Sequence, residues 1–467
     1  MIRSSFFYIG LFSLLISIFS FFNIIYSYYF NLYLNLDSYV YSLIISLFFG
    51  FLFTFKKKNV LKISIYKKII IVLMGYLLLP LFIATPYYLS IYNISFLDAY
   101  FEAISGFTST GFTVFNNIKH LDESIILWRS SSQWIGGLYF LFSIILLIDI
   151  FDINLKKSLT NFLSFNSSET LKQLLKILIL YSFLTIIIFI ILNIFNIRFF
   201  TSLNLSMTLI SSGGFLPVNN LSDILNNKSQ EVVLGLMMLV SYFSLFFTYN
   251  LVKIKKNINF FQEDFYLLIY LFFIILLSFL LFRTNYNFSS FFLALASSIS
   301  NIGFATELSQ NNISFFFLIL TIVGGSFFST SSGIRFVKLY SLFKFSINEL
   351  ISHVKPKNVY ITKLKFSNSK FEVSEVNKFF LSVIVFIISL LILSSILSFT
   401  HINFENSFKL AILTLMNTVN SEIHGLKGFN FQELQYYTKY FLIFFMIIGR
   451  VELLTLLIII KKFFFKN

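Results

Sequence analysis

One pattern occurs four times along the sequence: a short apolar run begins with Phe, and a turn follows fifteen residues later. Counted from Phe96, Phe199 and Phe288, it ends on a glycine followed by Phe, and counted from Phe404 it ends on Val419. Small polar residues stand just before each of these positions: Ser109, Ser212, Asn301 and Asn417. Phe makes up 67 of 467 residues, so single matches carry little weight, but the repeated order of elements predicts four quasi-repeats of one unit.

The segments between these runs place the chain in a membrane. Hydrophobic residues make up 57 % of the sequence and charged residues 12 %, whereas a soluble domain has about 25 % charged residues. A helix that crosses the hydrocarbon core needs about 20 mostly apolar residues. Stretches of this kind lie near 6–30, 38–55, 69–91, 125–150, 175–197, 231–252, 265–283, 313–342 (interrupted), 377–399 and 436–460.

The four runs themselves are too short to cross, since a helix rises only about 1.5 Å per residue. We therefore expect four re-entrant half-helices that enter the membrane and return through an irregular turn. The fold class predicted is an all-α polytopic membrane protein with about ten transmembrane helices, four pore half-helices and pseudo-fourfold symmetry.

Basic residues fix the expected orientation. They gather after the second, fourth, sixth and eighth stretches and at the end of the chain, which in a ten-helix arrangement is one side of the membrane. By the positive-inside rule this side is the cytoplasm, with both termini there and the half-helices entering from outside. The net charge of +15 is explained by this orientation, and no nucleic-acid partner is expected.

The predicted organisation follows from these elements. It comprises two extra N-terminal transmembrane helices (1–66), repeat 1 (67–158), repeat 2 (159–258), repeat 3 with a broken second helix (259–345), a cytoplasmic loop (346–375) and repeat 4 (376–467). The cytoplasmic loop is interpreted as a solvated segment, with a docking surface for a cytoplasmic partner as the alternative.

Four turns at membrane depth favour a shared cation pathway. Irregular backbone is tolerated in a membrane only where protein buries it or where it lines a watery cavity. The C-terminal end of a half-helix carries partial negative charge, and the turn after it presents carbonyl oxygens. A ring of carbonyls that replaces a hydration shell is the selectivity principle of potassium channels. The absence of cysteine excludes a disulfide framework and thiolate metal sites.

Four motifs give the chain a specific resemblance. Residues 101–111 (FEAISGFTSTG) resemble FEaxSGxTTTG, and residues 128–137 (WRSSSQWIGG) resemble WRSxxQWxGG. Residues 324–335 (GGSFFSTSSGIR) resemble GGSxxSTxGGIK, and residues 449–455 (GRVELLT) resemble GRxExLT. These are motifs of the Trk/Ktr/HKT potassium-transporter superfamily, and the two extra N-terminal helices make the chain similar to its TrkH-like ion-conducting subunit.

The resemblance implies potassium uptake, with or without sodium, through one pore per subunit in a bacterial inner (plasma) membrane. It also implies a homodimer and a cytoplasmic, nucleotide-binding regulatory ring of the TrkA/KtrA type. No cofactor is expected in this chain, and potassium is its substrate. The residues predicted to form the selectivity filter are Thr108, Ser109, Thr110, Gly111, Ser211, Ser212, Gly213, Gly214, Ser300, Asn301, Ile302, Gly303, Asn417, Thr418 and Val419.

The resemblance implies that the interruption of the eighth stretch, at 324–333, is an intramembrane gate loop below the filter. A kinked packing helix with small residues at an interface is the alternative reading. The predicted loop residues are Gly324, Gly325, Ser326, Ser329, Thr330 and Gly333.

Buried polar side chains are expected to support the pore. Arg450 lies inside the tenth helix, where a charge is costly, and we expect it to face the pore and hold the loop carbonyls; pairing with Glu452 is the alternative. Arg129 and Gln133 lie one helical turn apart and are predicted to brace the filter. Glu102 is expected at the outer mouth, where it could concentrate cations.

The fourth repeat departs from the family pattern. Val419 stands where the family usually has glycine, and a β-branched residue at positive φ is an outlier. Either Val419 adopts another backbone conformation, or the carbonyl ring is complete on only three sides. A sodium or non-selective monovalent cation pathway is therefore one alternative function, and a membrane-embedded glycosyl-transfer or polymerase enzyme is another. The four histidines are expected to be solvated.

Overall fold

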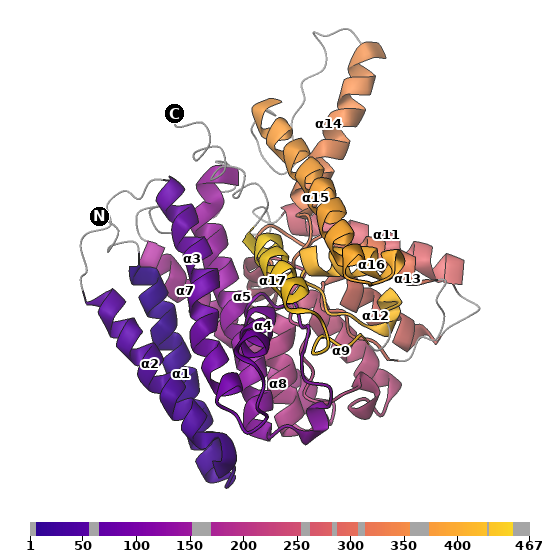
Figure 1. Cartoon of the computed structure of the whole chain (residues 1–467). Coiled ribbons are helices and arrows are strands. Elements are labelled where there is room, and N and C mark those ends of the chain that lie inside the picture. Colours follow the sequence, from indigo (N-terminus) through magenta and orange to yellow (C-terminus); the bar gives the residue numbers. More distant parts are fainter. Residues whose placement is uncertain are drawn as a thin grey trace.

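The computed structural model describes residues 6–55, 65–151, 170–253, 262–282, 287–306, 313–354, 373–426 and 429–451. These residues form helices and connecting turns, with a single isolated β-bridge between Val323 and Ile334. The helices pack side by side into one bundle (Figure 1). The expected all-α architecture is therefore confirmed.

Two helices precede the first repeat, as expected. α1 (Phe7–Tyr29) and α2 (Leu36–Thr54) form a hairpin through a stripe of small residues. Ser13 Oγ donates to the carbonyl of Ser46 at 2.7 Å, and the hydroxyls of Ser20 and Ser42 lie 3.1 Å apart. Small residues let helix backbones approach closely where lipid gives no hydrophobic drive for association.

Each repeat then contains a half-helix of 12 residues. These are α4 (Phe96–Phe107), α8 (Phe199–Ile210), α12 (Phe288–Ile299) and α16 (Phe404–Leu415). All four begin at the Phe from which the sequence repeat was counted. At about 1.5 Å per residue, each spans about 18 Å, well short of a hydrocarbon core of about 30 Å.

Longer helices flank the half-helices. They are α3 (Ile65–Tyr88), α5 (Glu123–Phe151), α7 (Thr170–Ile194), α11 (Gln262–Phe282), α15 (Val373–Phe399) and α17 (Tyr436–Val451). Within the described ranges, seven helices are long and apolar enough to cross a membrane. The other expected crossings are two interrupted helices and α17, whose last expected residues lie outside the described part.

Two crossings are broken, although the sequence analysis expected one. The eighth stretch divides into α13 (Ser314–Ile322) and α14 (Phe336–Val354), as expected. The sixth stretch, expected to run unbroken over 231–252, divides into α9 (Lys228–Val240) and α10 (Leu245–Lys253). That expectation was wrong because the apolar run continues through the break, where only two serines, at 241 and 244, interrupt it.

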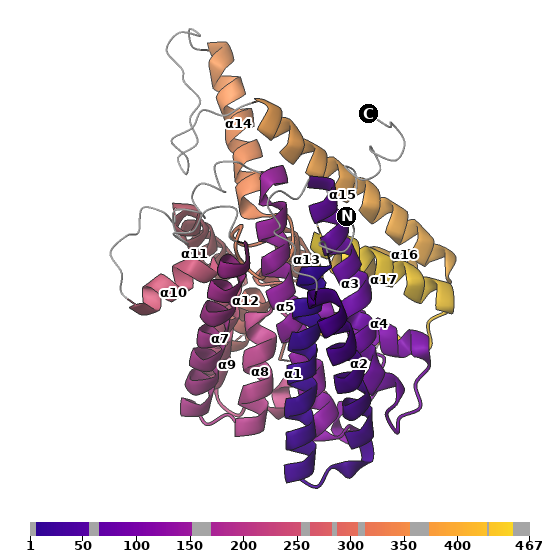
Figure 2. The same cartoon turned by 90° about the vertical axis from the view of Figure 1, so that its left-hand side faces the viewer.

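α14 extends further than expected and projects beyond the neighbouring helices (Figures 1 and 2). The segment expected to be a cytoplasmic loop, 346–375, begins as helix up to Val354. Residues 355–372 lie outside the described part of the chain.

Candidate functional site

The four half-helices end in the same backbone turn. The residue after the last helical position caps the helix, and the next residue adopts the left-handed conformation: φ is 58° at Ser109, 56° at Ser212, 60° at Asn301 and 48° at Asn417. These are the small polar residues singled out in the sequence. The recurrence of this unusual conformation at one register position shows that the four turns are copies of one structure. Glycine was expected at the position with positive φ, but at this first left-handed position the four turns have Ser or Asn.

The position two residues later differs between repeats. Among the described residues, it has a positive φ at Gly111 (85°) and Gly303 (90°) but not at Gly214 or Val419. The φ of Val419 is therefore not positive, and a β-branched residue adopts such a backbone conformation without strain. Of the two alternatives drawn from the sequence, the structure has the first, in which Val419 adopts another backbone conformation.

The side chain of Val419 nevertheless lies close to two neighbouring turns. A Cβ atom built on Gly214 would come within 2.5 Å of the Val419 Cβ, and one built on Gly303 would come within 2.7 Å of its Cγ1. The amide of Val419 donates to the carbonyl of Ile302 at 3.4 Å. The absence of a side chain at Gly214 and Gly303 thus leaves space for the side chain of Val419. The carbonyl of Ile302, in the third turn, accepts a hydrogen bond from the protein.

Side chains of the left-handed residues join the turns into a ring. Ser212 Oγ donates to the carbonyl of Ser300. Asn301 Nδ2 donates to Thr418 Oγ1 at 3.2 Å, and Asn417 Nδ2 donates to Thr110 Oγ1 at 3.0 Å. Repeat 2 is thereby tied to repeat 3, repeat 3 to repeat 4, and repeat 4 to repeat 1.

Arg450 bridges the remaining seam, between repeats 1 and 2. Its Nη2 donates to Ser109 Oγ at 3.3 Å and to the carbonyl of Ser211 at 3.4 Å. The side chain is 1 % exposed, and its guanidinium lies 4.0 Å from the centre of the Phe140 ring. One guanidinium therefore completes the ring that three polar side chains build elsewhere.

Arg450 also reaches the predicted gate loop, but not in the expected way. Its Nη1 donates to the hydroxyl of Ser332, whereas the sequence analysis expected contact with loop carbonyls. Arg335 makes the carbonyl contacts: its Nη1 donates to the carbonyls of Ser326 at 3.2 Å and Ser331 at 2.9 Å. Glu452, the alternative partner of Arg450, lies outside the described residues.

Backbone hydrogen bonds join the two ends of the predicted gate loop. Gly324 N donates to the carbonyl of Ile334 at 2.9 Å, and Ile334 N donates to the carbonyl of Ile322 at 3.0 Å. Gly333 has a φ of 79°, which favours glycine. Thr330 Oγ1 donates to the carbonyl of Ile210 at 2.7 Å, at the end of the second half-helix. The loop is thus hydrogen-bonded directly to the end of the second half-helix, next to its turn.

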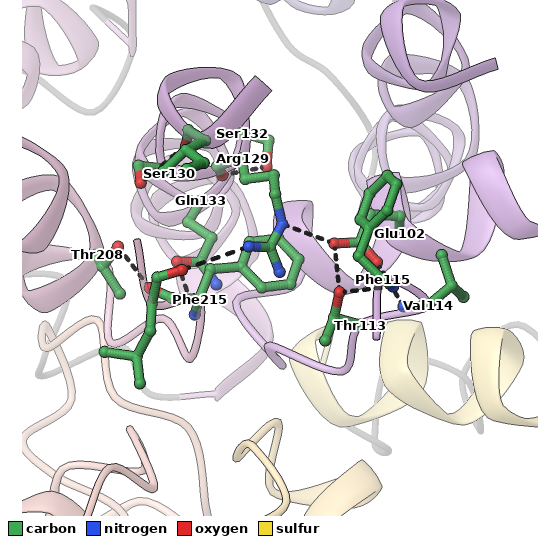
Figure 3. A network of polar contacts seen from close by, with 12 residues as sticks. Glu102, Thr113, Val114, Phe115, Arg129, Ser130, Ser132, Gln133, Thr208 and Phe215 are labelled. Atoms are coloured by element: carbon green, nitrogen blue, oxygen red, sulfur yellow. Dashed lines mark hydrogen bonds and ion pairs between the residues drawn. The ribbon is translucent and has the colours of Figure 1, made fainter. Parts of the chain in front are cut away.

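A buried ion pair braces the first turn from α5 (Figure 3). Arg129 Nε lies 2.9 Å from Glu102 Oε1, and the side chains are 1 % and 0 % exposed. Glu102 also accepts hydrogen bonds from Val114 N at 2.9 Å and Thr113 Oγ1 at 3.0 Å, just after the turn. The expectation that Glu102 attracts cations at the outer mouth was wrong, because its carboxylate is committed to Arg129 and to the chain leaving the turn.

Gln133, one helical turn further along α5, braces the second turn. With its amide oriented to satisfy its partners, its oxygen accepts from Gly214 N and Phe215 N, both at 3.0 Å, and its nitrogen donates to Thr208 Oγ1 at 3.2 Å. The guanidinium of Arg129 lies 4.1 Å from the centre of the Phe215 ring. Arg129 and Gln133 therefore connect the first two repeats.

A cavity of about 360 Å³ borders the ring of turns. Gly111, Gly214, Gly303 and Val419 all line it. Among the described residues, no group of three or more His, Asp or Glu side chains could hold a metal ion. The charged residues Arg129 and Glu422 also line the cavity.

His424 supports the fourth turn and was missed by the sequence analysis, which expected a solvated side chain. It lies in the short 3₁₀ helix Glu422–His424 and is 0 % exposed. Its Nδ1 lies 3.2 Å from Ser421 Oγ. Burial lowers the pKa of His424 to about 4, partly offset by a hydrogen bond with the backbone of Val419. No feature of the sequence around His424 signals this role.

Comparison with known proteins finds related sequences. Residues 37–286, more than half of the chain, match the TrkH family, described as cation transport proteins. The chain is 27 % identical over 349 residues to an uncharacterized cation transporter of Methanocaldococcus jannaschii, covering 71 % of this chain and 70 % of that protein. It is 26 % identical over 432 residues to the Trk system potassium uptake protein TrkG of Escherichia coli, covering 88 % of each.

The fold is similar to that of a solved structure. The crystal structure of the potassium transporter TrkH from Vibrio parahaemolyticus superposes with a TM-score of 0.79 at 21 % identity, covering 98 % of both chains. Together with the seven apolar spans, this confirms the prediction of a multi-pass membrane protein.

Replacing Arg129 tests the brace of the first turn. Arg129→Met leaves the Glu102 carboxylate buried without its partner, so we expect a loss of about 3–5 kcal/mol in unfolding free energy, and Glu102→Gln in the same chain should restore part of it. The matched control is Arg198→Met, which breaks an exposed pair with Glu123 at 3.4 Å and should cost less than about 1 kcal/mol. Thermal unfolding of the purified protein in detergent measures both, and equal losses would contradict the brace.

Acidification tests the burial of His424. The ring is neutral when buried and has a pKa below the ordinary 6.5, so its contribution is constant above pH 6.5. As the pH falls from 6.5 towards 4, the unfolded state binds the proton first, and the folded state loses stability. The melting temperature of the wild type should therefore fall more steeply across this window than that of His424→Gln. Parallel curves would show that the side chain is solvated.

Proposed function

This chain belongs to the TrkH family of cation transport proteins, and we propose that it takes up potassium through one pore per subunit formed by the four half-helix turns. Members of the family are transporters, so the alternative of a membrane-embedded enzyme is set aside. The substrate proposal is supported by the relatives named potassium uptake proteins, among them TrkG of Escherichia coli.

The observation that carries the proposal is the ring of four equivalent turns. Four half-helices end at the ring, and each directs the partial negative charge of its C-terminal end there. The turns line a cavity with glycines and carry no charged side chain, so a cation would be bound by carbonyl dipoles. The proposed filter is residues 108–111, 211–214, 300–303 and 417–419.

Release is proposed to occur past the loop at 324–333. The loop is hydrogen-bonded to the end of the second half-helix through Thr330, and the guanidinium of Arg450 joins the loop to repeats 1 and 2. A positive charge there opposes the passage of a cation, so the loop and Arg450 together would form the gate. The driving force is the membrane potential, about 2.3 kcal/mol per charge for each 100 mV.

Assembly and orientation complete the proposal. We place the chain in a bacterial inner membrane with both termini in the cytoplasm, as a homodimer regulated by a cytoplasmic nucleotide-binding ring. The four repeats would be 67–158, 159–258, 259–345 and 376–467, preceded by the helices of 1–66. The projection of α14 beyond its neighbours supports residues 346–375 as the region that meets such a ring (Figure 2).

A second candidate function is a sodium or non-selective cation pathway. It is favoured by the fourth turn, where the amide of Val419 engages the carbonyl of Ile302 and the Val419 side chain packs against two glycines. A carbonyl that accepts a protein hydrogen bond is less available to a dehydrated ion, and a ring with fewer carbonyls selects less sharply.

Ion flux into liposomes separates the two functions. Potassium selectivity predicts that rubidium enters at least tenfold faster than sodium at equal driving force, which corresponds to about 1.4 kcal/mol of discrimination. Equal entry of the two ions would support the second candidate. Liposomes without protein give the background leak.

The contact between Val419 and Gly214 can be tested by a double-mutant cycle. Gly214→Ala places a methyl group against Val419, so we expect it to lower rubidium flux by at least tenfold, and Val419→Gly should recover part of that loss by removing the opposing side chain. Val419→Gly alone should raise the preference for rubidium over sodium. Additive effects of the two substitutions would mean that the side chains do not meet.

A further inference from the structure

The break between α9 and α10 leaves backbone groups without helical partners. The carbonyls of Ser241 and Tyr242 follow the end of α9, and the amides of Ser244 and Leu245 precede the first turn of α10. Such groups need other partners, because water is scarce at this depth and an unpaired buried amide or carbonyl is costly.

The predicted gate loop supplies most of these partners. Ser326 N donates to the carbonyl of Tyr242 at 3.0 Å, and Ser331 N donates to the carbonyl of Ser241 at 3.2 Å. In the opposite direction, Leu245 N donates to the carbonyl of Phe328 at 3.2 Å. The break in repeat 2 and the loop in repeat 3 thus satisfy each other's backbone.

Glycine allows this close approach. A Cβ atom built on Gly325 would lie 2.2 Å from the carbonyl oxygen of Tyr242, so no other residue fits there without displacing the break. The rings of Phe246 and Phe328 also pack together, with centroids 5.6 Å apart. The two interruptions are therefore complementary in shape as well as in hydrogen bonding.

Two adjacent acidic residues on the first turn of α11 contact both the break and the loop. Asp264 Oδ1 accepts from Ser244 N at 2.9 Å, and Glu263 Oε1 accepts from Phe327 N at 2.9 Å. The first contact caps the start of α10, and the second lies in the loop. Asp264 is 2 % exposed, and its carboxyl group also interacts with the hydroxyl of Ser326 in the loop.

We propose that Glu263 and Asp264 are positioning residues that hold residues 241–244 and the loop as one gating unit, so that the break in repeat 2 moves together with the loop. The proposal rests on the loop acting as the gate. If the loop moved alone, the carbonyls of Ser241 and Tyr242 would lose their donors, and the amide of Leu245 would lose its acceptor. Movement of both segments about the α11 acids avoids this cost.

The absence of cysteine from the chain permits a direct test. Single reporters, Ser241→Cys in the break and Ser329→Cys in the loop, replace side chains that are 2 % and 1 % exposed. Their rates of modification by a small thiol reagent report opening of each segment in the full-length protein in liposomes. Rubidium flux is measured in the same preparations.

Glu263→Ala removes contacts to the loop, at Phe327 N and the Ser326 hydroxyl, yet the proposal predicts faster modification of both reporters, on the order of tenfold from the loss of one hydrogen bond. Glu263→Gln keeps an acceptor oxygen and should give a smaller rise at both positions, which provides a test if the alanine variant does not fold. The matched control is Asp37→Ala, an exposed acid in the first turn of α2, which should change neither rate.

The outcomes separate the two levels of the proposal. A rise at Ser329→Cys with an unchanged rate at Ser241→Cys, in either Glu263 variant, would show that the break and the loop move independently and would overturn the coupling. A rise at both reporters with increased rubidium flux supports the coupling and the gate together. A rise at both with unchanged flux supports the coupling while contradicting the loop as the gate.

Discussion

The ring of turns and the helix breaks depend on one constraint, the need to satisfy backbone amides and carbonyls that leave a helix inside a membrane. Within the described residues, this happens at four half-helix ends and at two helix breaks. At the half-helix ends, left-handed Ser and Asn residues turn the chain, and their side chains bond to the next repeat. At the breaks, the two interruptions use each other.

Two buried arginines connect these satisfied backbones to one another. Arg129 uses Glu102 as its counter-ion and fixes the chain just after the first turn. Arg450 instead contacts neutral groups in the described part of the chain: the hydroxyls of Ser109 and Ser332, the carbonyl of Ser211 and the face of the Phe140 ring. Because hydroxyl and carbonyl dipoles rather than a carboxylate contact the guanidinium of Arg450, its positive charge is not neutralised by those contacts. This fits the proposed role of Arg450 between the turns and the loop.

Much of this architecture could be predicted from sequence, because it depends on length, apolarity and repetition. The four half-helices begin at the Phe residues from which the repeat was counted, and the interruption at 324–333 was visible as a run of small residues. The break at 241–244 was not visible, because only two serines mark it. The roles of Glu102 and His424 depend on tertiary burial, which no local pattern encodes. The strain expected at Val419 was misplaced, because the left-handed residue lies two positions earlier.

The central claim is that the four turns bind a dehydrated monovalent cation through their carbonyls. The most direct measurement is anomalous diffraction from crystals of the protein grown with rubidium or thallium. The account predicts anomalous density on the axis between residues 108–111, 211–214, 300–303 and 417–419, with sodium unable to displace it at equal concentration. Density confined to the cavity that borders the ring, with none between the turns and the Val419 amide still bonded to the Ile302 carbonyl, would contradict it.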